Sequence, residues 1–279
     1  MNFSGARDDT HLIELWLAGR PENTRKAYGH TSAHFSAFTT ERNLGIRDTT
    51  VADVVAWIDS LTGAPASKAR HISGLKSLLT FAHRTGYAAF NVGKAIQCPR
   101  VPDLLHERIV DEDAILDVIK HATTPRDRAL VLVLYYSGAR ISEVCGLRFK
   151  DLRGVHATLV RGKGTKVRTV LLPKAVIDAM LVLRGPADSD ATAVFRSTRG
   201  ASMSRGTAYF VVKQITEAAG VTMSPHWFRH AHATHSLEAG APINVVQKSL
   251  GHKSLNTTSR YVHMRPGQGS SGYLRQVPG

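Results

Sequence analysis

The sequence predicts a mainly α-helical protein with one small β-hairpin, arranged as an all-helical first domain and a mixed α/β second domain. Three observations predict this fold class. Apolar residues recur at helical spacing through most of the chain, and two β-branched runs flank a glycine-rich turn in its second half. Pro99 and Pro102 interrupt the chain between the halves. We therefore expect domains at 1–92 and 108–279, joined by a linker at 93–107.

Four short helices account for the first domain. The first covers residues 10–17, and the second is capped by Asn23 and Thr24. A third follows Thr50 with apolar residues on one face through position 61. Ser67 opens the fourth, which Gly86 ends as a C-cap.

The second domain mixes helices with a hairpin. A helix follows Asp111, and a strongly apolar helix at 126–137 ends at Gly138. Strands at 157–160 and 167–172 enclose the turn, Arg-Gly-Lys-Gly-Thr-Lys. Further helices are expected near 174–184, 205–219, 225–239, 242–249 and 255–263. The segment 266–272 is rich in Gly and Ser, which predicts a flexible tail from about residue 266.

Charge is unevenly distributed along the chain. The 279 residues carry 36 Lys and Arg against 22 Asp and Glu, a net charge of +14. Residues 1–107 have a net charge of +2 and residues 108–279 a net charge of +12. Such an excess favours a polyanionic partner, most simply nucleic acid.

The cellular compartment follows from what the sequence lacks. Two cysteines, Cys98 and Cys145, cannot build a disulfide framework, which fits a reducing environment. The N-terminus has no apolar signal segment, and the longest apolar run, 129–136, has eight residues and is too short to span a bilayer. We expect a cytoplasmic protein without a membrane partner.

A first candidate site begins at Ser224 and Pro225, a cap and first position typical of a helix start. His226 and Arg229 then share one face of the first turn, where backbone N–H groups already favour anions. Ordinary capping with a surface arginine is the alternative. A metal site is disfavoured: His226 and His230 are spaced i, i+4, with His232 and His235 nearby, but no Glu follows His226 as in a metalloprotease helix.

Other candidate residues are ambiguous when taken singly. Arg140 precedes Glu143 by three residues, so the carboxylate can orient the guanidinium for phosphate binding or form a minor surface pair. Lys163 lies between two glycines of the hairpin turn. Tyr261 follows His252 by nine residues, and a tyrosine can act as a covalent nucleophile.

The order and spacing of these residues resemble the catalytic set of the tyrosine recombinases, the phage integrase family. The resemblance rests on the stretch from Ser224 to His235, on Leu250-Gly-His252, and on Thr257-Thr258-x-x-Tyr261. It covers nearly the whole chain. It implies a helical core-binding domain of the SAM-like type and a mixed α/β catalytic domain that together clamp duplex DNA, as in Xer-type recombinases and small phage integrases.

The resemblance also implies a role for each residue. Tyr261 would attack the scissile phosphodiester to give a 3′-phosphotyrosyl link, while Arg140 and Arg229 hold the non-bridging oxygens. Lys163 would protonate the leaving 5′ oxygen, with Lys166 as the competing choice, and His226 would assist proton transfer. His252 would hydrogen-bond the phosphate and Glu143 would support the site. No cofactor is implied: fixed cations take the place of a metal, and ATP is not needed because the phosphotyrosine conserves the bond energy.

DNA contacts are expected on both domains, since backbone phosphates set affinity. In the first domain the candidates are basic or polar residues of two helices: Thr24, Arg25, Lys26, Tyr28, Lys68, Arg70, His71, Lys76 and Arg84. Each could equally belong to a solvated helix face. In the second domain Lys166 and Arg168 follow the hairpin turn.

The implied partners are double-stranded DNA with paired recombination sites and an accessory directionality protein. The enzyme would act as a homotetramer in the synaptic complex and would be associated with the nucleoid. We expect no arm-binding domain, because the helical domain begins within about ten residues of the N-terminus. The segment 272–277 could dock on a neighbouring subunit as an extended piece. Two alternatives stay open: a type IB topoisomerase-like nick-and-reseal enzyme and a non-catalytic DNA-binding accessory protein.

Overall fold

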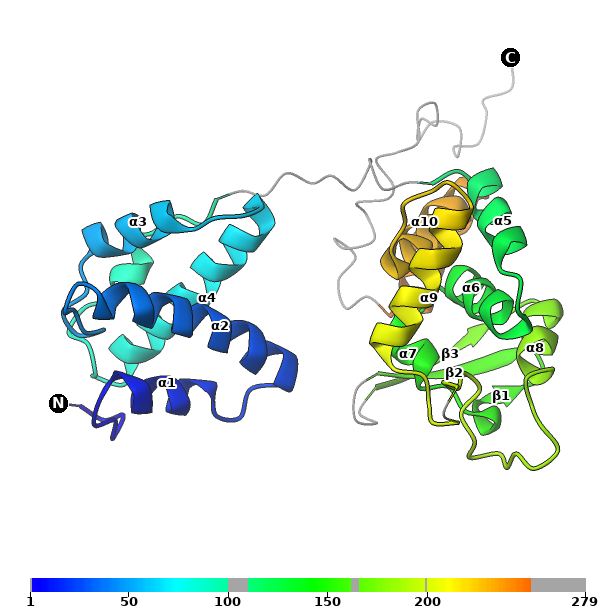
Figure 1. The fold of residues 1–279 in the computed structure, drawn as a ribbon, viewed down its shortest axis with the longest axis horizontal. Helices are drawn as coiled ribbons and strands as arrows, with labels where there is room; N and C mark the ends of the chain where they lie inside the picture. Colours follow the sequence, from blue (N-terminus) through cyan, green and yellow to red (C-terminus); the bar gives the residue numbers. More distant parts are fainter. Residues whose placement is uncertain (1, 100–109, 162–165, 199, 252–279) are drawn as a thin grey trace, which may run out of the picture. The chain divides into compact units, whose positions relative to one another are not determined.

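The structure is a computed structural model that describes residues 2–99, 110–161, 166–198 and 200–251. The chain divides into two compact units, Met1–Asp103 and Leu104–Gly279, which are drawn in Figure 1. Each unit has its own hydrophobic core. Within the described ranges, no helix combines the length and apolar character needed to cross a membrane.

Helices are the only regular secondary structure in the described residues of the first unit. Its elements are α1 (Asp9–Leu17), α2 (Glu22–Thr40), α3 (Val51–Ser60), α4 (Pro65–Arg84) and the 3-10 turn η1 (Val92–Lys94). Thr50 and Asp53 form a reciprocal capping box at the start of α3, so two backbone N–H groups that a helix start leaves unpaired are satisfied.

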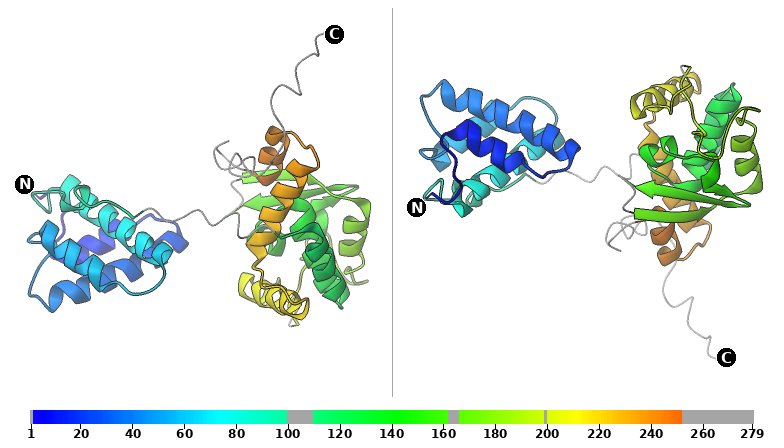
Figure 2. Two further views of the ribbon diagram at one scale, coloured as in Figure 1. Left: turned by 90° about the horizontal axis from the view of Figure 1, so that it is seen from above. Right: turned by 90° about the horizontal axis from the view of Figure 1, so that it is seen from below.

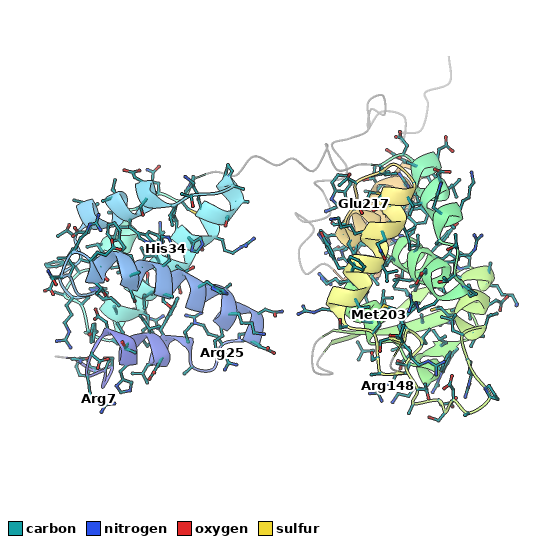
Figure 3. All side chains as sticks on the ribbon, viewed as in Figure 1. Arg7, Arg25, His34, Arg148, Met203 and Glu217 are labelled. Carbon is teal, nitrogen blue, oxygen red and sulfur yellow. The ribbon has the colours of Figure 1, made fainter. Side chains whose placement is uncertain are left out.

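Aromatic side chains fill the core of the helical unit. Trp57 is fully buried, and its ring meets that of Phe35 edge to face at 5.5 Å. The indole Nε1–H of Trp57 donates to Nδ1 of His34, 2.9 Å away, and Figure 3 labels His34 on α2. Helices α2 and α4 pack so closely that a Cβ atom at Gly74 would lie 3.0 Å from the Thr31 hydroxyl.

The second unit surrounds a small sheet with helices. Its elements are α5 (Glu112–His121), α6 (Pro125–Ser137), α7 (Ile141–Cys145), η3 (Phe149–Asp151), β1 (Leu152–Arg153), β2 (His156–Arg161), β3 (Lys166–Leu171), α8 (Lys174–Leu181), α9 (Arg205–Ala218), α10 (Pro225–Glu238) and α11 (Ile243–Leu250). Helix α6 is central: Leu130, Val131 and Val133 have no exposed surface. Its apolar sequence is that of a helix buried on all sides.

The sheet is antiparallel with the order β1-β2-β3. Leu159 and Val170 are buried, whereas Val167 and Leu171 are exposed, so only one face packs on the helices. The view from below in Figure 2 shows the strands in front of the helices. Arg168 pairs across the sheet with Leu159 and therefore projects from the inner face.

Most of the expected elements are present, and the differences have local causes. Helix α2 begins at Glu22, because the Pro21 carbonyl already accepts the N–H of Arg25, so Asn23 and Thr24 lie within the first turn. Helix α4 begins at Pro65, since proline suits the first helical position, and Ser67 follows inside it. The two-residue strand β1 was not expected. The helix expected near 255–263 and the tail lie outside the described residues.

The segment expected to be a linker, 93–107, begins with ordered residues of the helical unit. Gly93 and Ile96 are buried, and Ile96 joins the aromatic core of that unit. The Lys76 ammonium also donates a hydrogen bond to the Ile96 carbonyl. The buried side chain of Ile96 and the hydrogen bond to its carbonyl together hold this part of the chain against the helical unit.

Gly138 makes the turn between α6 and α7 possible. It has a φ of +55°, in the left-handed region that side chains disfavour. A Cβ atom there would lie 2.6 Å from Leu250 Cδ2 and 2.7 Å from His232 Cδ2. Both backbone conformation and space therefore require glycine.

His232 packs against this turn as a neutral side chain. Burial, together with the nearby charges of Arg229 and Arg168, lowers the pKa of His232 to about 4 against the opposing hydrogen bond to the Tyr135 carbonyl. The imidazole therefore stays uncharged in the folded protein at neutral pH.

The Gly138→Ala variant is expected to destabilise the second unit by roughly 2–4 kcal/mol, from the left-handed backbone and the overlap with His232 and Leu250. Hydrogen exchange of α6 and α10 amides measures this free energy. The control is Gly146→Ala, whose Cβ would lie 3.4 Å from its nearest neighbour and which should change stability by less than about 0.5 kcal/mol. Equal effects of the two variants would contradict the close packing at Gly138.

His232 makes the stability of the second unit depend on pH. Its pKa is about 4 when folded and about 6.5 when unfolded. Between these values the unfolded chain binds more protons, so stability falls as the pH is lowered. The contribution lost from pH 7 to pH 5 is roughly 2 kcal/mol. Urea unfolding at pH 7 and pH 5 measures this loss of stability. The loss should be smaller by roughly 2 kcal/mol in the His232→Asn variant than in wild type, whereas His156→Asn, at an exposed position, should lose as much stability as wild type.

Candidate active site

Glu143 lies at the centre of the candidate site, on the short helix α7. Its side chain is 1% exposed. One carboxylate oxygen, Oε2, accepts the backbone N–H of Arg140 at 2.8 Å, and the other, Oε1, accepts from Arg140 Nη1 at 3.3 Å. The carboxylate therefore caps its own helix and orients the guanidinium of Arg140, whose side chain is 29% exposed.

Arg168 approaches the same carboxylate from β3. Its Nη1 donates to Glu143 Oε1 at 2.8 Å. Burial alone would raise the pKa of Glu143, but the hydrogen bonds from Arg168 and the Arg140 backbone, with the two guanidinium charges, outweigh burial and lower it. Glu143 is therefore an anion at neutral pH, held between two cations.

Arg229 is the buried arginine of the site, with 2% of its surface exposed. Its Nη1 donates to the Gly138 carbonyl at 2.7 Å and its Nη2 to the Leu250 carbonyl at 2.6 Å. Both carbonyls lie at helix ends, where they lack partners within the helix. The guanidinium thus connects α10 to the ends of α6 and α11.

His226 lies in the first turn of α10 and is exposed, one turn above Arg229. Its ring meets that of His230 edge to face at 4.5 Å, and His230 is buried. The expected start of this helix is confirmed: Ser224 is the N-cap and Pro225 the first residue. Searched over the described residues, no group of three or more His, Cys, Asp and Glu side chains could hold a metal ion.

The structure brings together part of the predicted catalytic set. Arg140, Glu143 and Arg229 meet around the segment 138–143, with His226 on the same helix as Arg229. Lys163, His252 and Tyr261 lie outside the described residues. Lys166 begins β3 in the described backbone. Arg168, predicted as a DNA contact, has a side chain that is 15% exposed and paired with Glu143.

The residues predicted to contact DNA in the helical unit occupy several faces. Arg25 and Lys26 are exposed in the first turns of α2, where Figure 3 labels Arg25, and Lys26 pairs with Glu22 at 2.8 Å. Tyr28 is partly buried and stacks on Trp16 with a centroid distance of 4.9 Å. Of the candidates on α4, Arg70 and Arg84 are exposed, and Lys68, His71 and Lys76 are partly buried.

A basic hollow in the helical unit contains Arg20, a candidate DNA contact that was not predicted from the sequence. It encloses about 270 Å³ and is lined by Arg20, Lys76, Ser77, Thr80, Phe81 and Arg84. The Arg20 guanidinium lies 5.0 Å from the ring centroids of both Trp16 and Tyr28, and it donates to the Trp16 carbonyl and to Ser77. Helix α1 ends at Leu17 and Gly19 has a φ of +71°, so Arg20 reaches back to Trp16 from outside the helix, and no helical spacing indicates this contact.

Comparison with known proteins gives two family matches. The model described as "Phage integrase family" matches residues 108–267, and that described as "Phage integrase, N-terminal SAM-like domain" matches residues 9–86. The match over 108–267 alone covers more than half of the chain.

Curated relatives align along most of the chain. A tyrosine recombinase XerD from Corynebacterium glutamicum is 37% identical over 286 residues, covering 91% of this chain and 93% of the relative. A tyrosine recombinase XerD from Pseudomonas aeruginosa is 34% identical over 275 residues, covering 92% of each.

Solved structures share the fold. A lambda integrase dimer bound to a COC′ core site superposes with a TM-score of 0.74 at 16% identity, covering 96% of this chain and 81% of that chain. A lambda integrase tetramer bound to a Holliday junction superposes with a TM-score of 0.71 at 16% identity, covering 89% and 78%. On the family matches and the curated relatives together, this chain belongs to the phage integrase family, alongside the Xer tyrosine recombinases.

Proposed function

We propose that this protein is a site-specific recombinase that cleaves and rejoins double-stranded DNA through a 3′-phosphotyrosyl intermediate. The observation that carries the proposal is the position of two arginines. Arg229 is fixed by the carbonyls of Gly138 and Leu250, and Arg140 follows Gly138 by two residues and is oriented by Glu143. Two positioned guanidinium groups suit a phosphate whose negative charge grows in the transition state.

The reaction assigns the remaining roles. The Tyr261 oxygen attacks phosphorus, the bond from phosphorus to the 5′ oxygen breaks, and Lys163 supplies the proton for that oxygen. His226 assists proton transfer at the tyrosine, and His252 donates a hydrogen bond to the phosphate. Lys166 remains the competing general acid. Attack by a 5′-hydroxyl on the phosphotyrosine reverses the sequence and rejoins the strand.

The proposed assembly is a homotetramer on two recombination sites, because each of four strands needs one nucleophile for a complete exchange. Relatives support this arrangement: one solved structure is a lambda integrase tetramer on a Holliday junction. An accessory protein that sets the direction of exchange is part of the proposal. So is a cytoplasmic location on the nucleoid, where the DNA substrate lies.

The helical unit is proposed to bind the DNA backbone through its basic surface. The net charge of residues 1–107 is only +2, so binding depends on a local concentration of cations. Arg20, Lys76 and Arg84 supply one at the basic hollow, with the hydroxyls of Ser77 and Thr80 beside them. Arg25, Arg70 and Lys68, with Thr24, Lys26, Tyr28 and His71, are the other proposed contacts.

Covalent capture on nicked DNA tests the proposed reaction. On a duplex nicked just 3′ to the cleavage site, the short strand leaves after cleavage and the phosphotyrosyl adduct accumulates. Wild type should form the adduct, detected by its slower migration in a denaturing gel, and Tyr261→Phe should form none because it lacks the attacking oxygen. An adduct with Tyr261→Phe, or none with wild type, would contradict the mechanism. Relaxation of a two-site plasmid without recombinant product would favour the topoisomerase alternative.

Salt dependence tests the proposed backbone contact of the helical unit. Removing one phosphate contact with Arg84→Gln should weaken DNA binding equally for all sequences and reduce the slope of log K against log[salt] by about 1. Arg42→Gln is the control, because Arg42 lies over the Phe38 ring at 3.7 Å and does not line the hollow. Fluorescence anisotropy at several salt concentrations measures both slopes. An unchanged slope for Arg84→Gln would remove this residue from the interface.

A further inference from the structure

Arg168 competes with Arg140 for one carboxylate oxygen. Both guanidinium groups donate to Glu143 Oε1, Arg168 at the shorter distance of 2.8 Å and Arg140 at 3.3 Å. Glu143 is 1% exposed, so among the described residues its negative charge is shared by two cations in a desolvated place. The group of three side chains has a net charge of +1, whereas a closed pair of Arg140 and Glu143 would have none.

This charge balance determines how much positive charge Arg140 can present to a ligand. A carboxylate committed to Arg140 alone can bind it bidentately and neutralise it. With Arg168 holding Oε1 more closely, the carboxylate still orients Arg140 but no longer cancels its charge. Arg140, at 29% exposure, is the more accessible of the two arginines, since Arg168 is 15% exposed.

Arg168 also joins three segments of the proposed active site. It lies on β3, five residues after Lys163 in the sequence, and it pairs with Glu143 on α7. A Cβ atom at Gly251 would lie 3.3 Å from Arg168 Nη1, so the guanidinium also packs on the end of α11, one residue before His252 in the sequence. No aliphatic or shorter cationic side chain can make all of these contacts.

The remaining donors of Arg168 indicate that stability is not its main purpose. Its Nε and Nη2 atoms are buried and make no hydrogen bond with any described residue. Buried donors without an acceptor are costly and rare in folded proteins. A fold that tolerates this cost beside a catalytic site has a functional reason to keep a cation there.

From these contacts we propose that Arg168 is a positioning residue for the recombination reaction: by drawing the Glu143 carboxylate to itself, it keeps Arg140 oriented and positively charged toward the scissile phosphate. The inference rests on the proposed function, since it needs Arg140 to bind that phosphate. It gives Arg168 a role through Glu143 in place of the direct DNA contact predicted from the sequence.

Single-turnover cleavage of the nicked duplex, with DNA affinity measured separately, tests this role. Arg168→Gln should lower the cleavage rate about 10- to 100-fold at saturating protein, the range seen when a supporting side chain is lost. Its Kd for DNA should stay within about twofold of wild type, because the buried guanidinium makes no backbone contact. Arg168→Lys, which restores the charge, should recover part of the rate.

A methylphosphonate at the scissile position separates positioning from general damage. Replacing one non-bridging oxygen with a methyl group removes the negative charge that Arg140 stabilises. The defect of Arg168→Gln should then shrink to less than about threefold relative to wild type on the same substrate, since a neutral phosphonate needs less of the Arg140 charge. A defect of equal size on both substrates would overturn the proposal and assign Arg168 a structural role.

Arg196→Gln is the matched control. Arg196 pairs with the mostly buried Asp188 at 2.7 Å in the same unit, so its loss also breaks an ion pair but should leave the cleavage rate unchanged. A larger Kd for Arg168→Gln with an unchanged saturated rate would support a DNA contact and reject the inference. If Arg168→Gln does not fold, Arg168→Lys carries the test: a reduced rate on phosphate that approaches the wild-type rate on the methylphosphonate would support the inference, and an equal defect on both substrates, or no defect on either, would refute it. Absence of an adduct with wild type would instead reject the proposed function itself.

Discussion

The second unit depends on one buried cation, the guanidinium of Arg229. Burying a charge is costly unless hydrogen bonds replace its hydration, and here the carbonyls of Gly138 and Leu250 do so at 2.7 and 2.6 Å. Those carbonyls end helices α6 and α11, so both helices would otherwise have buried acceptors without partners. Replacing Arg229 would therefore disconnect α6, α10 and α11 as well as remove a proposed phosphate ligand. The structural role and the proposed catalytic role cannot be separated at this position.

The need to bury Arg229 also explains why it follows His226 by three residues. Two side chains three residues apart lie on the same side of a helix, separated by about one turn along its axis. Helix α10 begins near the surface and descends into the core, so His226 is exposed while Arg229 is 2% exposed. An imidazole that exchanges protons needs access to the reacting groups, and a guanidinium that holds its position needs fixed acceptors. One helix entering the core supplies both.

Local sequence features predicted much of this arrangement. The left-handed Gly138, the Pro225 helix start, the hairpin and the pairing of Arg140 with Glu143 all depend on residues close in sequence, and each is present. The contacts between distant segments were not predictable in this way. Arg168 reaches Glu143 from another element, and Arg229 reaches a carbonyl 91 residues away. Backbone carbonyls leave no mark in the residue pattern, so their pairing with a side chain becomes visible only in the fold.

The distribution of charge separates affinity from catalysis. Residues 108–279 carry a net charge of +12, yet the arginines nearest the proposed chemistry are buried or partly buried, and Glu143 offsets part of the charge of Arg140 and Arg168. Their contribution comes from fixed direction in a place of low dielectric, where each charge acts more strongly than at the surface. Exposed cations elsewhere attract DNA over longer distances and are screened by salt. It follows that raising the ionic strength should weaken binding much more than the cleavage rate of DNA already bound, because Glu143, Arg168 and Arg229 are largely shielded from the counterions that compete for the surface.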